Sequence, residues 1–561
     1  MALLKEEIKS FLKGDVADDS ETLEKYSKDY SLFKIKPKVV VFPKDAEDVG
    51  NLVKFADAQN KKGRRINLTA RSGGTDMTGG PLGDSVVVEF TRYFNQIKKI
   101  VVSSDGGNVV VQSGVYYRDF EKELGKKGLM FPPYPASKNI CAVGGMLANN
   151  SGGEKTLAYG KTEDYVQELK VVLSDGKEHI IKPLSKSEFF KKMEEKGFES
   201  DLYRELWRLI DKNKALIQKA RPNVSKNSAG YALWNIWSPS NLDLTKPFIG
   251  YFDLTKLLIG SQGTLGLITE AKLRLVPVKK YSRLAVVFLS DLRPLADIVV
   301  EILKFKPESL ESYDDKTFRV ALRYFPEIFK IMGGNVLKLA FQFLPDVLML
   351  LRGGVPKLVL MISFTSDDKV ELEERLTRFK KAVLKFKFPI KITRNEVEAE
   401  KYFTIRRQSF RLLREHAGGK STAPFIDDFI VQPKYLPEFL PKLNEILDKY
   451  KDKLIYTIAG HPGDGNFHII PLMNLKDEQV RAVIPRLSEE VYDLVLRYNG
   501  SITAEHNDGL IRTPYLEKMF GKEVVKLFVE TKKIFDPLNI FNPGKKTNMD
   551  IKTAMSYVNP K

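Results

Sequence analysis

The 561-residue sequence contains one cysteine, five histidines and no apolar run that approaches the length needed to span a lipid bilayer. A single cysteine, Cys141, excludes an internal disulfide and is typical of a reducing compartment. The first eight residues, MALLKEEI, carry acidic side chains early and no long apolar core, so we expect no secretory signal peptide. The predicted location is therefore the cytoplasm.

The sequence also lacks a dense basic block, although its formal net charge is +18. Such a charge could serve nucleic acid, an anionic membrane surface or anionic small molecules. The lysines are spread along the chain and no zinc-finger or RNP-type motif is present, so we expect no nucleic-acid binding. A hydrophobic content of 43% with 29% charged residues is typical of a globular protein, and the length predicts two or three domains.

Because histidine is scarce, the pair His461 and His468 is informative. The loop between them holds two glycines, a proline and Asx residues, a composition typical of a tight turn, and apolar runs at 453–459 and 469–472 predict a buried strand on each side. A Glu-His pair follows within 504–507. Imidazole and carboxylate together suit zinc or a similar divalent metal, with a position left open for substrate. The alternative is a glycine-rich turn with two hydrogen-bonded histidines.

Two glycine-rich segments predict a cofactor site in the N-terminal half. A strand at 66–70 leads into 71–80 (RSGGTDMTGG), where four glycines let successive backbone N–H groups converge on a pyrophosphate. This is not the G-x-G-x-x-G dinucleotide fingerprint, because the loop enters another strand, at 85–90, instead of a helix. The second segment, 144–153 (GGMLANNSGG), offers small residues where a flat ligand or a backbone could approach. Either segment alone could also be an ordinary loop.

These motifs resemble the vanillyl-alcohol-oxidase type of flavoprotein. The glycine segments and 258–266 (LIGSQGTLG) look like its FAD-binding half. The motifs at 461–468, 504–506 and 535–545 resemble the C-terminal half of its D-2-hydroxy-acid dehydrogenase branch. That branch includes D-lactate dehydrogenases, the glycolate oxidase flavin subunit and D-2-hydroxyglutarate dehydrogenases. The match covers about residues 37–180, 225–320 and 395–546.

The resemblance implies an α+β fold: a two-part FAD-binding domain of the PCMH type plus an α+β cap domain with an open antiparallel sheet. From Tyr281 onward, strands such as 284–289 and 358–364 alternate with long helices such as 372–386, which agrees with such a cap. The expected parts are a peripheral helical segment (1–36), the FAD-binding domain (37–280) with a helical insertion at about 181–224, the cap (281–506) with an apolar helical insertion at about 322–356, and a C-terminal segment (507–561) that returns to the FAD domain.

The resemblance also implies two cofactors, FAD and a divalent metal. No histidine precedes His179, so the histidyl-flavin bond of some relatives is not available and we expect non-covalent FAD. By the same resemblance the metal ligands are His461, His468 and Glu505, with zinc expected first and manganese or iron as alternatives. The residues implied to contact the FAD are Arg71, Ser72, Gly73, Gly74, Thr75, Asp76, Gly79, Pro133, Gly144, Gly145, Asn149, Gly152, Gly153, Tyr159, Gly160, Ile268 and Asn542.

The implied reaction is oxidation of a D-2-hydroxy acid to the 2-oxo acid, with hydride passing from C2 to flavin N5. His506 would take the hydroxyl proton, although a fourth metal ligand or an outer partner of the site is an alternative role for it. Arg406 would bind the substrate carboxylate, with its neighbour Arg407 as the competitor. Asn466 would contact substrate or flavin from the histidine loop.

Two positions bear on the substrate. D-2-hydroxyglutarate enzymes carry a threonine and a lysine where this sequence places Phe410 and Ile426, and neither can pair with a distal carboxylate. D-lactate or glycolate is therefore favoured, with D-2-hydroxyglutarate as an alternative. A non-catalytic flavin-binding subunit of an oxidase complex also stays open. The sequence departs from the family pattern at Phe403, where tryptophan is frequent, and at Gln262, where glutamate is more usual.

The segment 322–356 is unusually apolar for a stretch that prolines and glycines interrupt. Short apolar helices flanked by basic residues can lie in a membrane interface, and we expect peripheral contact with the cytoplasmic membrane face. The alternative is that these helices pack inside the cap. Because the sequence has no nicotinamide fingerprint, the expected electron acceptor is a quinone or an electron-transfer protein. The oligomeric state is not predicted.

Overall fold

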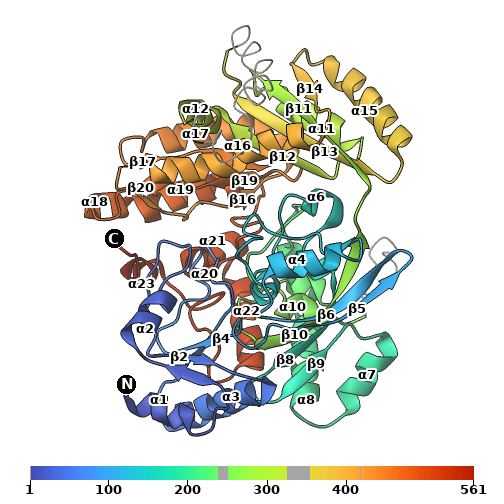
Figure 1. The fold of residues 1–561 in the computed structure, drawn as a ribbon. Coiled ribbons are helices and arrows are strands. Elements are labelled where there is room, and N and C mark those ends of the chain that lie inside the picture. The colour runs from blue at the N-terminus through green and yellow to red at the C-terminus, as the bar shows by residue number, and fades with distance from the viewer. Residues whose placement is uncertain (1, 238–250, 325–326, 328–353, 417, 561) are drawn as a thin grey trace.

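The computed structural model describes residues 2–237, 251–324, 327, 354–416 and 418–560. Figure 1 shows two lobes: the elements coloured blue to green form the lower one, and the yellow and orange elements form the upper one. The red helices at the C-terminal end lie against the lower lobe. Most of the apolar segment predicted at 322–356 falls outside the described residues. Within the described ranges, no helix combines the length and hydropathy needed to cross a membrane.

A four-stranded sheet lies near the N-terminus. Its strands, in spatial order, are β1 (Asp15–Ala17), β2 (Val39–Phe42), β4 (Val86–Glu89) and β3 (Leu68–Arg71). β2, β4 and β3 run parallel, and their near-continuous apolar residues are buried, as expected of strands covered on both faces. Helix α3 (Ala46–Lys61) makes the crossover from β2 to β3. The strands predicted at 66–70 and 85–90 are thus confirmed as β3 and β4.

The first 36 residues pack against this sheet. Helix α1 (Ala2–Lys9) buries Leu4 and Ile8 in the same core as β2 and α3, and α2 (Ser20–Tyr26) buries Leu23 beside β2. The predicted peripheral segment is therefore part of the lobe, because it supplies apolar side chains that cover the sheet.

The second sheet of the lower lobe is antiparallel throughout. Its strands, in spatial order, are β5 (Ile97–Ser103), β6 (Gly106–Gln112), β10 (Leu267–Pro277), β8 (Val166–Val172) and β9 (Glu178–Ile181), with β7 (Leu129–Met130) paired to β10. The helices around it are α4 (Tyr117–Gly125), α5 (Val143–Asn149), α6 (Thr156–Tyr159), α7 (Lys186–Glu194), α8 (Phe198–Lys212), α9 (Lys214–Ala220) and α10 (Thr255–Leu258). Helices α7 to α9 lie within the predicted insertion and bury Leu202 and Leu206 in the core of this lobe.

The upper lobe is built on an open, antiparallel seven-stranded sheet, which confirms the predicted α+β cap. Its strands, in spatial order, are β14 (Ile390–Ile392), β11 (Tyr281–Leu289), β13 (Leu358–Ser366), β12 (Ser309–Asp314), β18 (Ile458–His461), β19 (Asn466–Ile469) and β16 (Phe429–Ile430). Alternate residues of β11 and β13 enter two different hydrophobic cores. Because side chains alternate across a strand, the sheet is covered on both faces.

Two helix layers provide that cover. The helices α11 (Leu295–Leu303), α15 (Lys369–Leu384), α17 (Leu436–Asp448) and α19 (Val483–Arg497) share one core, and α12 (Asp315–Arg323) and α16 (Glu396–Glu415) share the other. The short elements beside them are β15 (Ser421–Thr422), β17 (Leu454–Ile455), β20 (Leu472–Met473) and α18 (Glu478–Arg481). The strands predicted at 284–289 and 358–364 and the helix predicted at 372–386 are confirmed as β11, β13 and α15.

The chain then returns to the lower lobe through α20 (Gly509–Arg512), α21 (Leu516–Phe520), α22 (Lys522–Phe535) and α23 (Ile551–Ser556). Helix α22 packs against α8. Beyond it, Leu68 N donates to Ile540 O at 2.8 Å and Asn542 N donates to Leu68 O at 2.9 Å. The tail thus extends the first sheet beside β3, and it reaches the loop that was predicted to hold the cofactor.

Candidate active site

The two glycine segments meet at one cavity in the lower lobe, whose wall also includes His506. The glycines allow this meeting, because a Cβ on Gly73 would stand 2.7 Å from Ile140 O and a Cβ on Gly144 would stand 2.7 Å from Ser113 O. Asp76 shapes the first loop by accepting from Thr78 N at 2.9 Å and Gly80 N at 2.8 Å. Of the predicted cofactor residues, the cavity is lined by Arg71, Ser72, Gly73, Gly74, Thr75, Asp76, Gly144, Gly145, Asn149 and Ile268.

The remaining predicted cofactor residues lie outside the cavity lining: Gly79, Pro133, Gly152, Gly153, Tyr159, Gly160 and Asn542. Asn542 instead supports the loops from behind, since its Nδ2 donates to Gly80 O at 2.8 Å and to Gln262 O at 2.7 Å. Tyr30 and Ser113 also line the cavity and were not predicted from the sequence. Tyr30 belongs to the segment predicted as peripheral, and neither residue carries a motif that would have revealed it.

The cavity fits a flavin nucleotide in its polar groups. Its loops expose backbone N–H groups at glycines, and Asn149 Oδ1 is buried with no hydrogen-bond partner among the described residues. Such an orphaned acceptor suits an N–H donor of a bound ligand. Cys141 also lines the cavity, and burial raises the pKa of its thiol to about 12.

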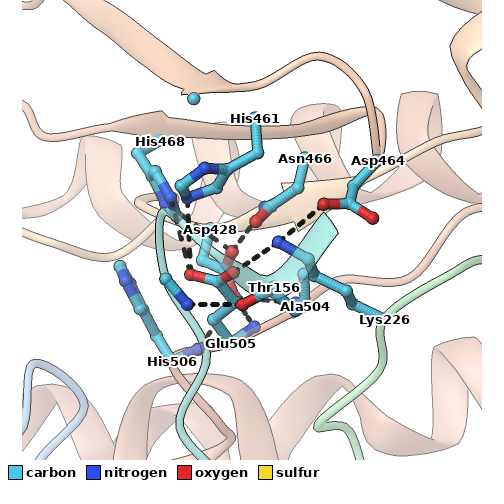
Figure 2. A network of polar contacts seen from close by, with 12 residues as sticks. Thr156, Lys226, Asp428, His461, Asp464, Asn466, His468, Ala504, Glu505 and His506 are labelled. Carbon is cyan, nitrogen blue, oxygen red and sulfur yellow. Dashed lines mark hydrogen bonds and ion pairs between the residues drawn. The ribbon is translucent and has the colours of Figure 1, made fainter. Parts of the chain in front are cut away.

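The three predicted metal ligands come together in the upper lobe. β18 ends at His461 and β19 begins at Asn466, so the hairpin places His461 and His468 near one another, with ring centroids 5.1 Å apart. Gly465, with φ of +79°, makes the turn. One ligand atom from each of His461, His468 and Glu505 lies within 4.8 Å of the others (Figure 2). The predicted strands on both sides of the loop are confirmed, although they include the histidines themselves.

The hydrogen bonds of the two rings orient them for a metal. His461 Nδ1 donates to Glu311 Oε1 at 2.6 Å, and His468 Nδ1 donates to the carbonyl of Asp427 at 3.2 Å. Both Nε2 atoms then face Glu505 Oε2, at 3.6 and 3.9 Å. These separations exceed a hydrogen bond and leave room for an ion bound to all three atoms.

The two rings differ electrostatically. Burial opposes charge on His461, but the carboxylates of Glu311 and Glu505 outweigh it and raise its pKa to about 9. Burial lowers the pKa of His468 to about 4, with the neighbouring His506 and His461 acting in the same direction. Neutral imidazole is the form that binds metal, so His468 is already in its ligand state.

Lys226 holds the other oxygen of Glu505. Its Nζ lies 2.6 Å from Glu505 Oε1 and 2.9 Å from Asp464 Oδ2, and the side chain is 1% exposed. Burial opposes the ammonium charge, yet Asp464 and Glu505 raise the pKa of Lys226, so it stays a cation. Figure 2 shows it between the two acids. No role was predicted for this lysine from the sequence.

His506 lies between the three predicted metal ligands and the cavity. Its Nδ1 lies 2.5 Å from Asp427 Oδ2, and its ring stacks on His468 with centroids 4.9 Å apart. Burial opposes its charge, but Asp427 and Asp428 raise the pKa of His506 to about 9. Because Nδ1 is engaged, Nε2 is the nitrogen left to exchange a proton with a substrate, and with this raised pKa the ring is mostly protonated at neutral pH.

Asp428 sets the path of the loop that carries Glu505 and His506. Its Oδ2 accepts from the backbone N–H groups of Ala504, Glu505 and His506 at 2.7, 2.8 and 3.0 Å. Its Oδ1 accepts from Asn466 Nδ2 at 2.8 Å. Asn466 is fully buried and also donates to Phe429 O, so it serves the loop and does not line the cavity.

The two candidate arginines differ in exposure. The side chain of Arg406 is 9% exposed, and its Nη2 lies 2.5 Å from Glu311 Oε2. Arg407 is 39% exposed and pairs with Glu154 at 3.3 Å and Glu400 at 3.1 Å. Arg406 is therefore the arginine that is linked, through Glu311, to His461 of the predicted metal ligands. Of the two substrate positions, Ile426 is buried in the cap core, and the side chain of Phe410 lies outside the described residues.

Comparison with known proteins agrees with this architecture. Residues 37–182 match a family described as FAD binding domain, and residues 278–546 match the FAD linked oxidases, C-terminal domain. The chain belongs to the FAD-linked oxidases of the PCMH type, and it therefore carries a FAD-binding domain. The p-cresol methylhydroxylase and the 4-ethylphenol oxidase of Gulosibacter chungangensis share its fold, each with a TM-score of 0.67 and at 15% and 16% identity. They cover 98% of this chain, which spans 97% and 98% of theirs.

Within that family, the resemblance to the D-2-hydroxy-acid dehydrogenase branch is confirmed. The chain is 28% identical to a D-2-hydroxyglutarate dehydrogenase of Pseudomonas putida, over 96% of this chain and 51% of the relative. It is 27% identical to the glycolate oxidase subunit GlcD of Bacillus subtilis, over 91% and 89%. It is 25% identical to a D-lactate dehydrogenase of Archaeoglobus fulgidus, over 90% of each chain. The chain thus spans about half the length of some curated relatives and most of others.

Proposed function

We propose that this protein oxidises a D-2-hydroxy acid to the 2-oxo acid with FAD and one divalent metal, zinc in the first instance. One observation carries the proposal: His461, His468 and Glu505 converge beside His506, which itself lines the cavity of the FAD-binding domain. A base, a cation site and a flavin site are the three parts that such an oxidation needs. Their retention in one place argues against a non-catalytic flavin-binding subunit.

FAD, when bound, supplies hydride acceptance, and a cation on the three ligands would supply Lewis-acid polarisation of the substrate oxygens. In its neutral form His506 takes the hydroxyl proton at Nε2, while Asp427 fixes the ring through Nδ1 and stabilises the imidazolium that forms. Because the pKa of His506 is raised to about 9, the neutral form gains population as the pH rises toward that value. Arg406 pairs with the substrate carboxylate, because a guanidinium matches two oxygens at once. Lys226 keeps Glu505 in place by holding its second oxygen.

For the substrate we propose a short monocarboxylate, D-lactate or glycolate. The buried Ile426 supports this choice, because an apolar side chain in the cap core cannot neutralise a distal carboxylate. D-2-hydroxyglutarate is the alternative, which the names of several relatives support. Anaerobic mixing of the purified protein with each acid tests the choice, with L-lactate as a control. Faster bleaching of the flavin by D-2-hydroxyglutarate than by D-lactate or glycolate would reject the monocarboxylate.

For the electron acceptor we propose a quinone or an electron-transfer protein, met at the cytoplasmic membrane face. The support is the net charge of +18, the apolar pattern at 322–356 and the absence of a nicotinamide fingerprint in the sequence. Co-sedimentation with anionic liposomes at low and high salt tests it. Protein that stays in the supernatant at both salt concentrations would favour a cytoplasmic enzyme with a soluble acceptor.

The visible spectrum and the metal content of the purified protein test the central proposal. We expect a flavin spectrum and about one zinc per chain, or one manganese or iron. Protein that is colourless after incubation with FAD and removal of the unbound FAD would reject every proposed function that uses a flavin. Active protein without metal would reject the assignment of His461, His468 and Glu505 as ligands.

A further inference from the structure

Glu311 is a buried acid that the proposed chemistry does not yet use. It lies in β12, it is fully buried, and no motif marks it in the sequence. An ionised carboxylate without partners is costly inside a protein, so its contacts indicate what it does. Within the described ranges it has two, one for each oxygen: Oε1 accepts from His461, and Oε2 forms an ion pair with Arg406 that lacks the geometry of a hydrogen bond.

The first contact fixes the ring of a metal ligand. Because His461 Nδ1 donates to Glu311 Oε1 at 2.6 Å, the ring cannot rotate without losing a short, charge-assisted bond. Its Nε2 is thereby kept toward Glu505 Oε2. Carboxylates that accept from a ligand histidine orient it and raise its basicity, and their loss typically weakens metal binding about 10- to 100-fold.

The second contact fixes the arginine proposed for the substrate carboxylate. Arg406 extends from α16, and its Nη2 lies 2.5 Å from Glu311 Oε2. Its Nη1 is 3.9 Å from Glu154 Oε1, too far for a hydrogen bond, and its buried Nε has no hydrogen-bond partner among the described residues. The guanidinium is thus held by one corner, with other N–H groups left for an incoming carboxylate.

The sheet explains why one residue can reach both groups. β12 pairs with β18 in antiparallel register, with Ser312 opposite Gly460. Continued by one residue, this register places Glu311 opposite His461, the last residue of β18. Glu311 stands two residues from Tyr313, which faces the core shared with α16, so both point to that side of the sheet. Glutamate is also long enough to divide its oxygens between a strand neighbour and a helix above the strand.

From these contacts we infer that Glu311 is a positioning residue that couples the metal site to the substrate-carboxylate site, holding His461 with one oxygen and Arg406 with the other. The inference rests on the proposed function, since it assumes both the metal and the role of Arg406. The metal and the substrate carboxylate would then be bound at a separation fixed by one side chain. A 2-hydroxy acid, whose hydroxyl and carboxylate are adjacent, matches two such neighbouring sites.

Two variants of Glu311 and two comparison variants test this role in the FAD-loaded protein. Competition with a chelator measures zinc affinity, and zinc-saturated kinetics give KM for the hydroxy acid. Glu311→Gln should weaken zinc binding about 10- to 100-fold and raise KM at least about tenfold, because it removes the negative charge that interacts with both His461 and Arg406. Glu311→Asp keeps the charge but is too short for both contacts, so it should show the same two changes to a smaller extent.

The comparison variants separate the two halves of the role. Arg406→Ala should raise KM and leave zinc affinity within about threefold of wild type. Glu308→Gln removes a similarly buried acid just before β12, which pairs with Lys155 and Tyr159, and it should leave zinc affinity unchanged. FAD content and melting temperature confirm that each variant is folded; if Glu311→Gln is not, Glu311→Asp decides.

Three results would overturn the inference. Zinc affinity unchanged in both Glu311 variants, with KM raised, would leave Glu311 as a partner of Arg406 alone. Weaker zinc binding with an unchanged KM would leave it as a partner of His461 alone. Wild-type protein that binds no zinc would reject the metal part of the proposed function together with the coupling, and this outcome is distinct because it appears before any substitution is made.

Discussion

The two histidines of the β18–β19 hairpin have the same chemistry, but their Nδ1 atoms have different partners, a carboxylate for His461 and a backbone carbonyl for His468. His468→Ala should remove metal and activity while FAD stays bound, because the flavin cavity lies in the other lobe. Elemental analysis and the visible spectrum measure the two cofactors separately. His416→Ala is the matched control, since His416 is an exposed histidine that pairs with Glu327. Equal metal content in both variants would remove His468 from the ligand set.

His506→Ala should lower kcat by about 100- to 10,000-fold, the usual loss when a general base is removed. Metal content should not change, because His506 is not one of the three proposed ligands, and FAD should stay bound, because His506 is one residue of a cavity wall formed mainly by the glycine loops. Steady-state kinetics with saturating substrate measure the effect. His179→Ala serves as a control, since that ring pairs with Asp175 and Glu199 outside the cavity lining. A loss below tenfold would move the base to another residue.

Cys141 should resist alkylation at pH 8 in the folded protein. The thiolate is the reactive form, and burial raises the pKa of this thiol to about 12, so only about one molecule in ten thousand carries it at that pH. Iodoacetamide followed by mass spectrometry measures the reaction, and protein unfolded in urea is the positive control. Because this is the single cysteine of the chain, any labelling reports on it alone. Rapid labelling of the native protein would contradict the burial.

At the scale of elements, Asn542 joins its own C-terminal segment to two distant ones, to 69–80 through Thr69 Oγ1 and Gly80 O and to the loop of Gln262 through Gln262 O. Asn542→Ala leaves two buried carbonyls without that donor, at a cost of about 1–3 kcal/mol each. We expect a lower free energy of unfolding and weaker FAD binding, measured by urea titration and by flavin release. Asn539→Ala is the control: it changes another asparagine of positive φ, but an exposed one. Equal losses would assign the effect to backbone strain instead.

The elements that local patterns specify were predicted well. Proline, glycine and Asx residues predicted the loop between His461 and His468, and the strands predicted at 66–70 and 85–90 are present as β3 and β4. The residues around the ligands could not be predicted in this way. Glu311 is 150 positions from His461, and Lys226 is 279 positions from Glu505. Only the order β12–β18–β19 and the return of the chain to the lower lobe bring them together.

Asp427 is a second example of a residue near the site that the sequence does not predict. A pair of aspartates with no motif around it gives no sequence signal, yet Asp427 holds both His506 and Arg512. Predicted cofactor residues such as Tyr159 and Gly160 lie outside this cavity lining, because a resemblance transfers a segment and not the place of each residue along a cavity wall. Their contact with FAD stays a prediction. The side chains proposed as metal ligands and as base do lie close together, since those residues sit in the short motifs themselves, and their roles stay predictions.

At the scale of the whole molecule, Lys226 links the lobes, because it comes from the segment before β10 and bonds to Glu505 and Asp464 of the upper-lobe loops. Lys226→Met leaves two buried carboxylates without their cation. We expect the free energy of unfolding to fall by about 3–5 kcal/mol in metal-free protein, the usual cost of breaking a buried ion pair. Urea unfolding with chelator present measures it.

Lys219→Met is the control for that prediction, since Lys219 is exposed on α9 and its loss should be small. Zinc added to the Lys226→Met protein should recover part of the stability, because the cation offers Glu505 a new counter-charge. Stability unchanged by either step would show that the two acids are accommodated without the lysine.

The hydrogen bonds of Asp428 bear on how many metal ions the chain could bind. Asp428, His468 and His506 form a second grouping of possible ligands among the described residues, and it shares His468 with the first. However, Asp428 Oδ2 already accepts from three backbone N–H groups and from Thr503 Oγ1, and Oδ1 accepts from Asn466. A carboxylate whose lone pairs are committed to donors has little left to give a cation. We therefore expect a single metal ion per chain, and titration with zinc should saturate at one equivalent.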